Sequence, residues 1–151
     1  MAPGPLDPER QRLLAKDLFN HVWTLLEAES RTPAQDDEMV HAVHASRYHW
    51  GMVGEPVNFA RGEWQCSRVY AVLGRAEPAL WHGRRCLDIC DEHGIRDFDL
   101  AYAYEALARA HRVAEQVPEA EAYERLAVEA GARIADPDDR EHFHEDLATL
   151  R

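Results

Sequence analysis

The chain has 151 residues, 46 % of them hydrophobic, which excludes a disordered polypeptide and suits one domain with a continuous core. The formal net charge of -11 at pH 7 argues against nucleic acid as the main partner. No stretch approaches the ~20 apolar residues needed to cross a bilayer, and the N-terminus lacks the apolar core of a signal peptide. We therefore expect an acidic, cytoplasmic protein without a membrane partner.

Apolar residues recur at three- and four-residue steps along most of the chain, which is the period of an amphipathic α-helix. In the first such segment, Leu14, Leu18, Val22 and Leu25 share one face. The predicted helices span residues 8–30, 33–53, 56–73, 77–93, 97–115, 118–131 and 137–150. No alternating pattern indicates a strand. We expect residues 1–8 to form a flexible N-terminal tail and residues 9–151 to form a single helical-repeat domain.

The ends of these helices are marked by residues that cannot continue them. Thr32 and Pro33 separate the first helix from the second, and Asp136 with Pro137 opens the last one. Four other predicted helices, the second, third, fourth and sixth, end at glycines, which suit the C-terminal end of a helix; these lie at positions 54, 74, 94 and 131. About seven helices joined by short turns predict an all-α fold of antiparallel helical hairpins.

Two segments of the chain are similar to each other at an offset of 41 residues. In the first segment the matched positions are Ser67, Tyr70, Gly74, Ala79, Gly83 and Cys86, and in the second they include Tyr104, Leu107, Ala108, Ala120 and Ala127. This pattern of small and aromatic residues over about 70 residues resembles the tetratricopeptide motif. The resemblance implies a short right-handed array of stacked hairpins, and a plain helical bundle is the structural alternative. The pattern departs from the family in its longer period, in Glu63 at an aromatic position and in Glu115 at a glycine position.

In tetratricopeptide-like stacks the first helix of each hairpin lines a concave face. The resemblance therefore places on that face the six residues Arg61, Trp64, Arg68, Tyr102, Arg109 and Arg112. We expect Trp64 to be exposed in this groove. Since arginine grips carboxylates in bidentate fashion, the predicted partner is a protein or peptide, including an acidic or carboxylate-bearing one. The alternative is that these arginines pair with internal acids such as Glu63 and Glu105.

A second candidate site lies on the helix predicted over 33–53. Asp37, His41 and His44 fall on one face of it, where two imidazoles and a carboxylate can hold a divalent transition metal or perform acid–base chemistry. A metal site would need a further ligand from a neighbouring helix, for which His21, Glu63 and His82 are the candidates. The alternative is a polar face without a ligand.

The three cysteines, Cys66, Cys86 and Cys90, have no zinc-type spacing, and we interpret them as buried thiols in preference to redox or metal-binding residues. Three hypotheses about function follow. The first is a protein- or peptide-binding helical repeat module without a cofactor, using the arginine and aromatic groove. The second is a metal-binding protein or metal-dependent enzyme with its site on the second helix. The third is a subunit or dimerisation domain, since the sequence is compatible with a homo-oligomer.

Overall fold

The computed structural model describes residues 6–150, and within them every regular element is an α-helix. The seven helices are α1 (Pro8–Glu27), α2 (Pro33–Val53), α3 (Pro56–Val72), α4 (Ala76–His93), α5 (Asp97–Val113), α6 (Val117–Ala132) and α7 (Pro137–Ala148). The predicted all-α class is therefore confirmed. Most of the predicted N-terminal tail lies outside the described residues, and α1 begins at Pro8. No helix in residues 6–150 is both long enough and apolar enough to cross a membrane.

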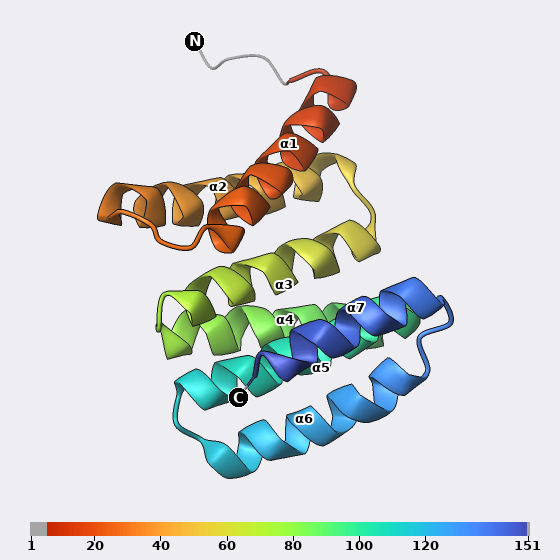
Figure 1. The fold of residues 1–151 in the computed structure, drawn as a ribbon. Coiled ribbons are helices and arrows are strands. Elements are labelled where there is room, and N and C mark those ends of the chain that lie inside the picture. The colour runs from red at the N-terminus through yellow and green to blue at the C-terminus, as the bar shows by residue number, and fades with distance from the viewer. Residues whose placement is uncertain (1–5, 151) are drawn as a thin grey trace.

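The helices pair in chain order as three hairpins, α1 with α2, α3 with α4 and α5 with α6. Figure 1 shows the hairpins stacked one after another, with α7 crossing over the last of them. Contacts between α2 and α3, between α4 and α5, and between α3 and α5 join neighbouring hairpins, while α7 packs on α5 and α6. This arrangement makes α3 the central helix of the stack.

Local sequence signals explain where these helices begin and end. Thr32 and Gln35 form a capping box at the start of α2, in which each side chain bonds the backbone of the other residue. The first helix ends three residues earlier than predicted, at Glu27, because the Arg31 guanidinium binds the Leu25 carbonyl at 3.1 Å and the chain turns there. Gly94 ends α4 with a φ of 65°, a left-handed conformation that glycine adopts without strain.

Two local features of the hairpin α3–α4 recur 41 residues later in α5–α6. The rings of Tyr70 and His82 stack with an interplanar angle of 7°, and so do those of His111 and Tyr123, with the two residue types exchanged. The turn residue Gly74 has a φ of 74°, and Glu115 holds the same left-handed conformation at 59°. The backbone therefore follows one course at both turns, although only the first carries the glycine.

The core follows the stack from one end to the other. Val22, Met39 and Val69 are buried where α1, α2 and α3 meet, and larger rings such as Trp64 and Phe143 fill the space between α3 and α7. All three cysteines are buried and free, as the sequence predicted. A buried charged side chain, Glu105 on α5, lies between α3 and α7.

Candidate functional site

The six residues predicted for the concave face come from α3 and α5, and the structure gives each of their side chains at least one internal polar partner. Arg61 binds both carboxylate oxygens of Asp99, at 2.8 and 3.2 Å, and this hydrogen bonding raises the pKa of Arg61. Arg112 binds Glu124 of α6. All four predicted arginines make internal ion pairs of the kind that the alternative interpretation describes.

Glu105 is the centre of the network that joins the remaining four predicted residues. Its side chain is 0 % exposed, and its Oε1 accepts hydrogen bonds from Arg68 at 3.0 Å and from Arg109 at 2.7 Å. Its Oε2 accepts one from the Trp64 indole at 3.2 Å. Two arginines from neighbouring helices are thus neutralised by one buried carboxylate, which leaves them committed inside the protein.

Helix α7 closes this network from the outside. Asp146 accepts a hydrogen bond from the Tyr102 hydroxyl at 2.6 Å, and Arg68 lies 3.5 Å from its other oxygen. Arg109 also donates to the Thr149 hydroxyl at 2.7 Å. Burial, together with the carboxylate of Asp146, raises the pKa of Tyr102, so this hydroxyl remains a donor.

Trp64 is 8 % exposed, which corrects the expectation that it would be open to solvent. Trp23 of α1 lies against one side of it, at 5.6 Å between ring centroids, and Tyr102 lies against another, at 5.4 Å. The exposed tryptophan is instead Trp81 of α4, at 63 %. Helical periodicity does not show that α1 and α7 cover the face of α3 that carries Trp64.

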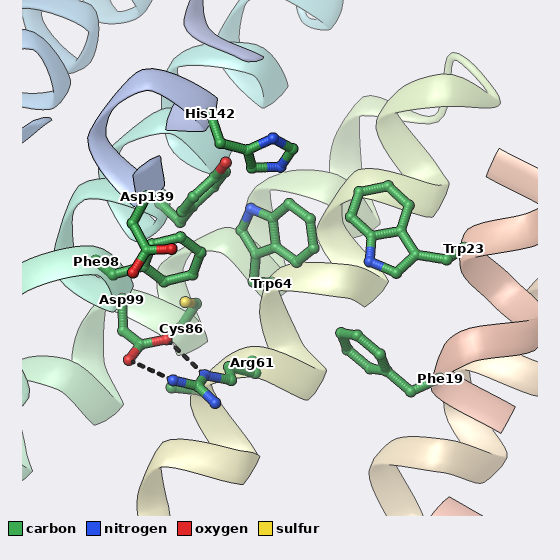
Figure 2. Close-up of a pocket in the computed structure, with 11 residues that line it drawn as sticks. Phe19, Trp23, Arg61, Trp64, Cys86, Phe98, Asp99, Asp139 and His142 are labelled. Carbon is green, nitrogen blue, oxygen red and sulfur yellow. Dashed lines mark hydrogen bonds and ion pairs between the residues drawn. The ribbon is translucent and has the colours of Figure 1, made fainter. Parts of the chain in front are cut away.

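A pocket of about 400 Å³ remains between α1, α3, α5 and α7, and five of the residues that line it are aromatic (Figure 2). The five rings are those of Phe19, Trp23, Trp64, Phe98 and Tyr102. Four of these rings follow one another in contact, since Phe98 lies 4.6 Å from Tyr102 and Trp64 contacts both Tyr102 and Trp23. Three of the residues predicted for the concave face therefore line this pocket, namely Arg61, Trp64 and Tyr102.

The rim of this pocket is acidic, and it continues into a second hollow of about 380 Å³ that shares Trp23 and His142 with the first. The charged residues lining the two hollows are the acids Glu27, Asp99, Asp139 and Asp146 and the bases Arg61 and Arg68, so the net charge is -2 with His142 neutral. The sequence reasoning missed these acids and the rings from α1. Phe19 and Trp23 are four residues apart on α1, and that spacing was the available signal.

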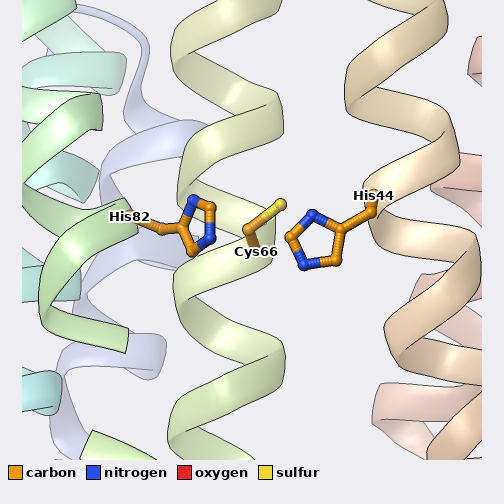
Figure 3. Close-up of side chains that lie close together, drawn as sticks. All are labelled: His44, Cys66 and His82. Carbon is orange, nitrogen blue, oxygen red and sulfur yellow. The ribbon is translucent and has the colours of Figure 1, made fainter. Parts of the chain in front are cut away.

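Of the three predicted metal residues on α2, only His44 belongs to a group of potential ligands within the described residues. Asp37 and His41 are exposed, whereas His44 joins Cys66 of α3 and His82 of α4 (Figure 3). Each of these three residues offers one potential ligand atom, and the three atoms all lie within 4.8 Å of one another. Within residues 6–150 they therefore form a group that could hold a metal ion. His82 was among the further ligands considered from the sequence, but Cys66 was interpreted only as a buried thiol.

Hydrogen bonds fix the two imidazoles of this group. Glu63 lies 2.6 Å from Nδ1 of His82 and accepts a bond from Arg47 at 3.1 Å. Although burial of Glu63 favours its protonated form, its bonds with His82 and Arg47 outweigh burial and lower its pKa. The Tyr70 hydroxyl lies 2.7 Å from Nε2 of His44.

Burial also shifts the pKa values of the His44 imidazole and the Cys66 thiol. It lowers the pKa of His44, with a second contribution from the nearby His82, and both effects favour the neutral ring. It raises the pKa of the Cys66 thiol. Neutral imidazole is the form that binds a metal ion, whereas a thiol must lose its proton to do so.

Comparisons of this chain with protein families, with curated proteins and with solved structures find no match.

Proposed function

We propose that the protein is a peptide-binding module of tetratricopeptide-like hairpins, and that it takes an arginine side chain of its partner into the aromatic pocket. The observation that carries this proposal is the pocket of about 400 Å³, with five aromatic rings on its wall and acids on its rim. A planar cation stacks on aromatic faces and is neutralised by carboxylates, so an arginine side chain fits both features.

The likeness of the two hairpins supports the repeat part of this proposal. The stacked pair of Tyr70 and His82 and the left-handed turn at Gly74 have counterparts 41 residues later. In addition, Ser67 donates to the Ala79 carbonyl at 2.8 Å, where a small residue on one helix meets the start of the next. Repeated hairpins leave a continuous face along their first helices, and such faces bind extended partners.

The charges of the groove favour a basic partner over an acidic one. An acidic ligand would have to displace Glu105 or Asp146 from Arg68, and Glu105 is wholly buried. In contrast, the Asp139 carboxylate makes no hydrogen bond or ion pair within the described residues and faces the pocket from its rim (Figure 2). The net charge of -11 adds long-range attraction for cationic ligands.

The expected affinity of a single side chain is low. A cation over an aromatic ring contributes about 0.5–2 kcal/mol, and a Kd of 1 mM requires about 4 kcal/mol, so we expect one arginine in the pocket to bind no more tightly than about 1 mM. The second hollow, beyond Trp23 and His142, offers room for the residues that flank this arginine. A peptide that fills both hollows therefore binds more tightly than its arginine alone.

The test compares three capped tripeptides that differ only at the central residue: arginine, its neutral isostere citrulline, and glutamate. Binding is measured by tryptophan fluorescence and by chemical shifts, since Trp23 and Trp64 line the pocket. The arginine peptide is expected to bind and the other two to bind at least about fivefold more weakly. Preferential binding of the glutamate peptide, or equal binding of arginine and citrulline, would contradict the proposal.

Two pairs of variants locate the binding site. Asp139→Asn is expected to weaken the arginine peptide by about two- to fivefold, the effect of one exposed charge, while Asp138→Asn in the same helical turn has no effect. Trp23→Leu keeps apolar volume but removes a ring face and is expected to weaken binding by about 0.5–2 kcal/mol. Trp81→Leu removes an exposed ring outside the pocket and serves as its control.

A further inference from the structure

A second site lies outside the groove, at the junction of the first two hairpins. His44 comes from α2, Cys66 from α3 and His82 from α4, and Figure 3 shows the Cys66 side chain between the two imidazoles. None of these residues lines the aromatic pocket. The cluster therefore needs an explanation of its own, beyond the peptide-binding function.

The donor atoms of this cluster suit a borderline or soft transition metal. Two imidazole nitrogens and one thiolate are ligands that zinc uses throughout proteins, and thiolates select against magnesium and calcium. In a tetrahedral zinc site, ligand atoms lie about 3.3–3.6 Å apart, given Zn–N and Zn–S lengths of about 2.0–2.1 and 2.3 Å. The three potential ligand atoms are within 4.8 Å of one another, so side-chain movements of about 1 Å bring them to the spacing of a zinc site.

The hydrogen bonds around the cluster leave one nitrogen of each ring available. Glu63 occupies Nδ1 of His82, so Nε2 remains for a metal, and the Tyr70 hydroxyl at Nε2 of His44 leaves Nδ1. A carboxylate on the outer nitrogen of a metal-binding histidine is the usual second layer of zinc sites, where it fixes the ring and strengthens its donor character. Arg47 holds Glu63 in place in turn.

We propose that His44, Cys66 and His82 bind one zinc ion, with Glu63 and Tyr70 orienting the two imidazoles. The ion takes the place of the Cys66 thiol proton, which is released on binding. Because the three ligands lie on α2, α3 and α4, the ion joins the first hairpin to the second. Zinc binding is therefore expected to raise the midpoint of thermal unfolding as well.

The first experiment titrates tag-free, chelator-treated protein with zinc chloride by calorimetry and with cobalt(II) by absorption spectroscopy. The expected result is one equivalent of either ion and a thiolate-to-cobalt charge-transfer band. Cys66→Ala is expected to abolish that band and to weaken zinc binding by more than about 100-fold, whereas the control Cys86→Ala, also buried, retains both. Cys66→Ser keeps the side-chain size and carries the test if the alanine variant does not fold, which far-UV circular dichroism reports.

The histidines are tested in the same way. His44→Ala and His82→Gln are each expected to weaken zinc binding by more than about 100-fold, and Glu63→Gln by about 10- to 100-fold with the stoichiometry unchanged. His41→Ala is the matched control, because His41 is exposed on α2 three residues before His44. Its loss should leave binding intact.

Several outcomes would overturn the proposal. One is the absence of stoichiometric zinc binding by the folded wild-type protein. Another is zinc binding that survives Cys66→Ala or Cys66→Ser, which would indicate an adventitious surface ion. A third is equal loss in His41→Ala, which would place the ion on the exposed face of α2.

Discussion

Removing the charge of Glu105 tests whether the arginines of the groove are committed inside the protein. In Glu105→Gln the side chain keeps its size, but Arg68 and Arg109 lose the buried carboxylate that they share. Breaking a buried ion pair from one side costs about 3–5 kcal/mol, because the remaining charge stays desolvated. We expect the lower end, about 3 kcal/mol, since Arg68 also reaches Asp146 and both guanidinium groups retain some exposure.

The assay for Glu105→Gln is urea denaturation followed by circular dichroism, with thermal unfolding as a second measurement. A loss of about 3 kcal/mol lowers the midpoint of thermal unfolding by about 6–12 °C in a domain of this size. The control is Asp91→Asn, which removes an ion pair with Arg96 in which both side chains are 62 % exposed. Such a pair contributes about 0–1 kcal/mol. If Glu105→Gln costs no more than Asp91→Asn, the arginines are not held by Glu105 and remain available to an acidic partner.

Four further substitutions, arranged as two pairs, give predictions that urea denaturation at constant m-value can check. Gly131→Ala is expected to lower the free energy of unfolding by about 1–3 kcal/mol, because a Cβ there would overlap the buried ring of Phe143. Gly51 is an exposed residue of α2, where a Cβ would meet only the flexible end of an arginine. Gly51→Ala is therefore expected to raise the free energy of unfolding by up to about 1 kcal/mol. Equal effects of these two changes would contradict the close packing of α6 and α7. Glu115→Gly is expected to stabilise by about 1 kcal/mol, because Glu115 is exposed with a φ of 59°, and Gly74→Ala is expected to destabilise by a similar amount at 74°. A loss of stability in Glu115→Gly would show that its side chain matters more than its backbone.

The helices were predictable because their signals are local. Capping at Thr32, the glycine after His93 and the prolines at helix starts act within one turn, so a single sequence reveals them. The largest displacement of a boundary, at Glu27, lies where the Arg31 side chain folds back onto the Leu25 carbonyl. The helical period of the sequence does not predict that contact.

The sites were only partly predictable, because periodicity assigns a residue to a face but does not say what packs against that face. Trp64 and Glu105 are 41 residues apart, and their hydrogen bond depends on how two hairpins stack. The same holds for His44, which shares a helical face with His41 yet meets Cys66 and His82 of other helices. The sequence allowed two interpretations of the arginines, a ligand-binding groove and pairing with internal acids. Choosing between them required the three-dimensional structure.

Helix α3 connects the two proposed sites, and its composition is unusual for the most buried helix of the stack. Ten of its 17 residues are buried, and Glu63, Gln65 and Ser67 are among them. Burying polar groups costs free energy unless each finds a partner, and these find Arg47 with His82, the Phe19 carbonyl and the Ala79 carbonyl.

An apolar helix would supply the same stability without such requirements, and one atom of this set, Gln65 Oε1, still lacks a hydrogen-bond partner within the described residues. Proteins break their own packing rules chiefly where a site must be built. Glu63 serves the histidine cluster, and its neighbour Trp64 serves the aromatic pocket. We therefore interpret the polar interior of α3 as the structural cost of holding the two proposed sites on one helix.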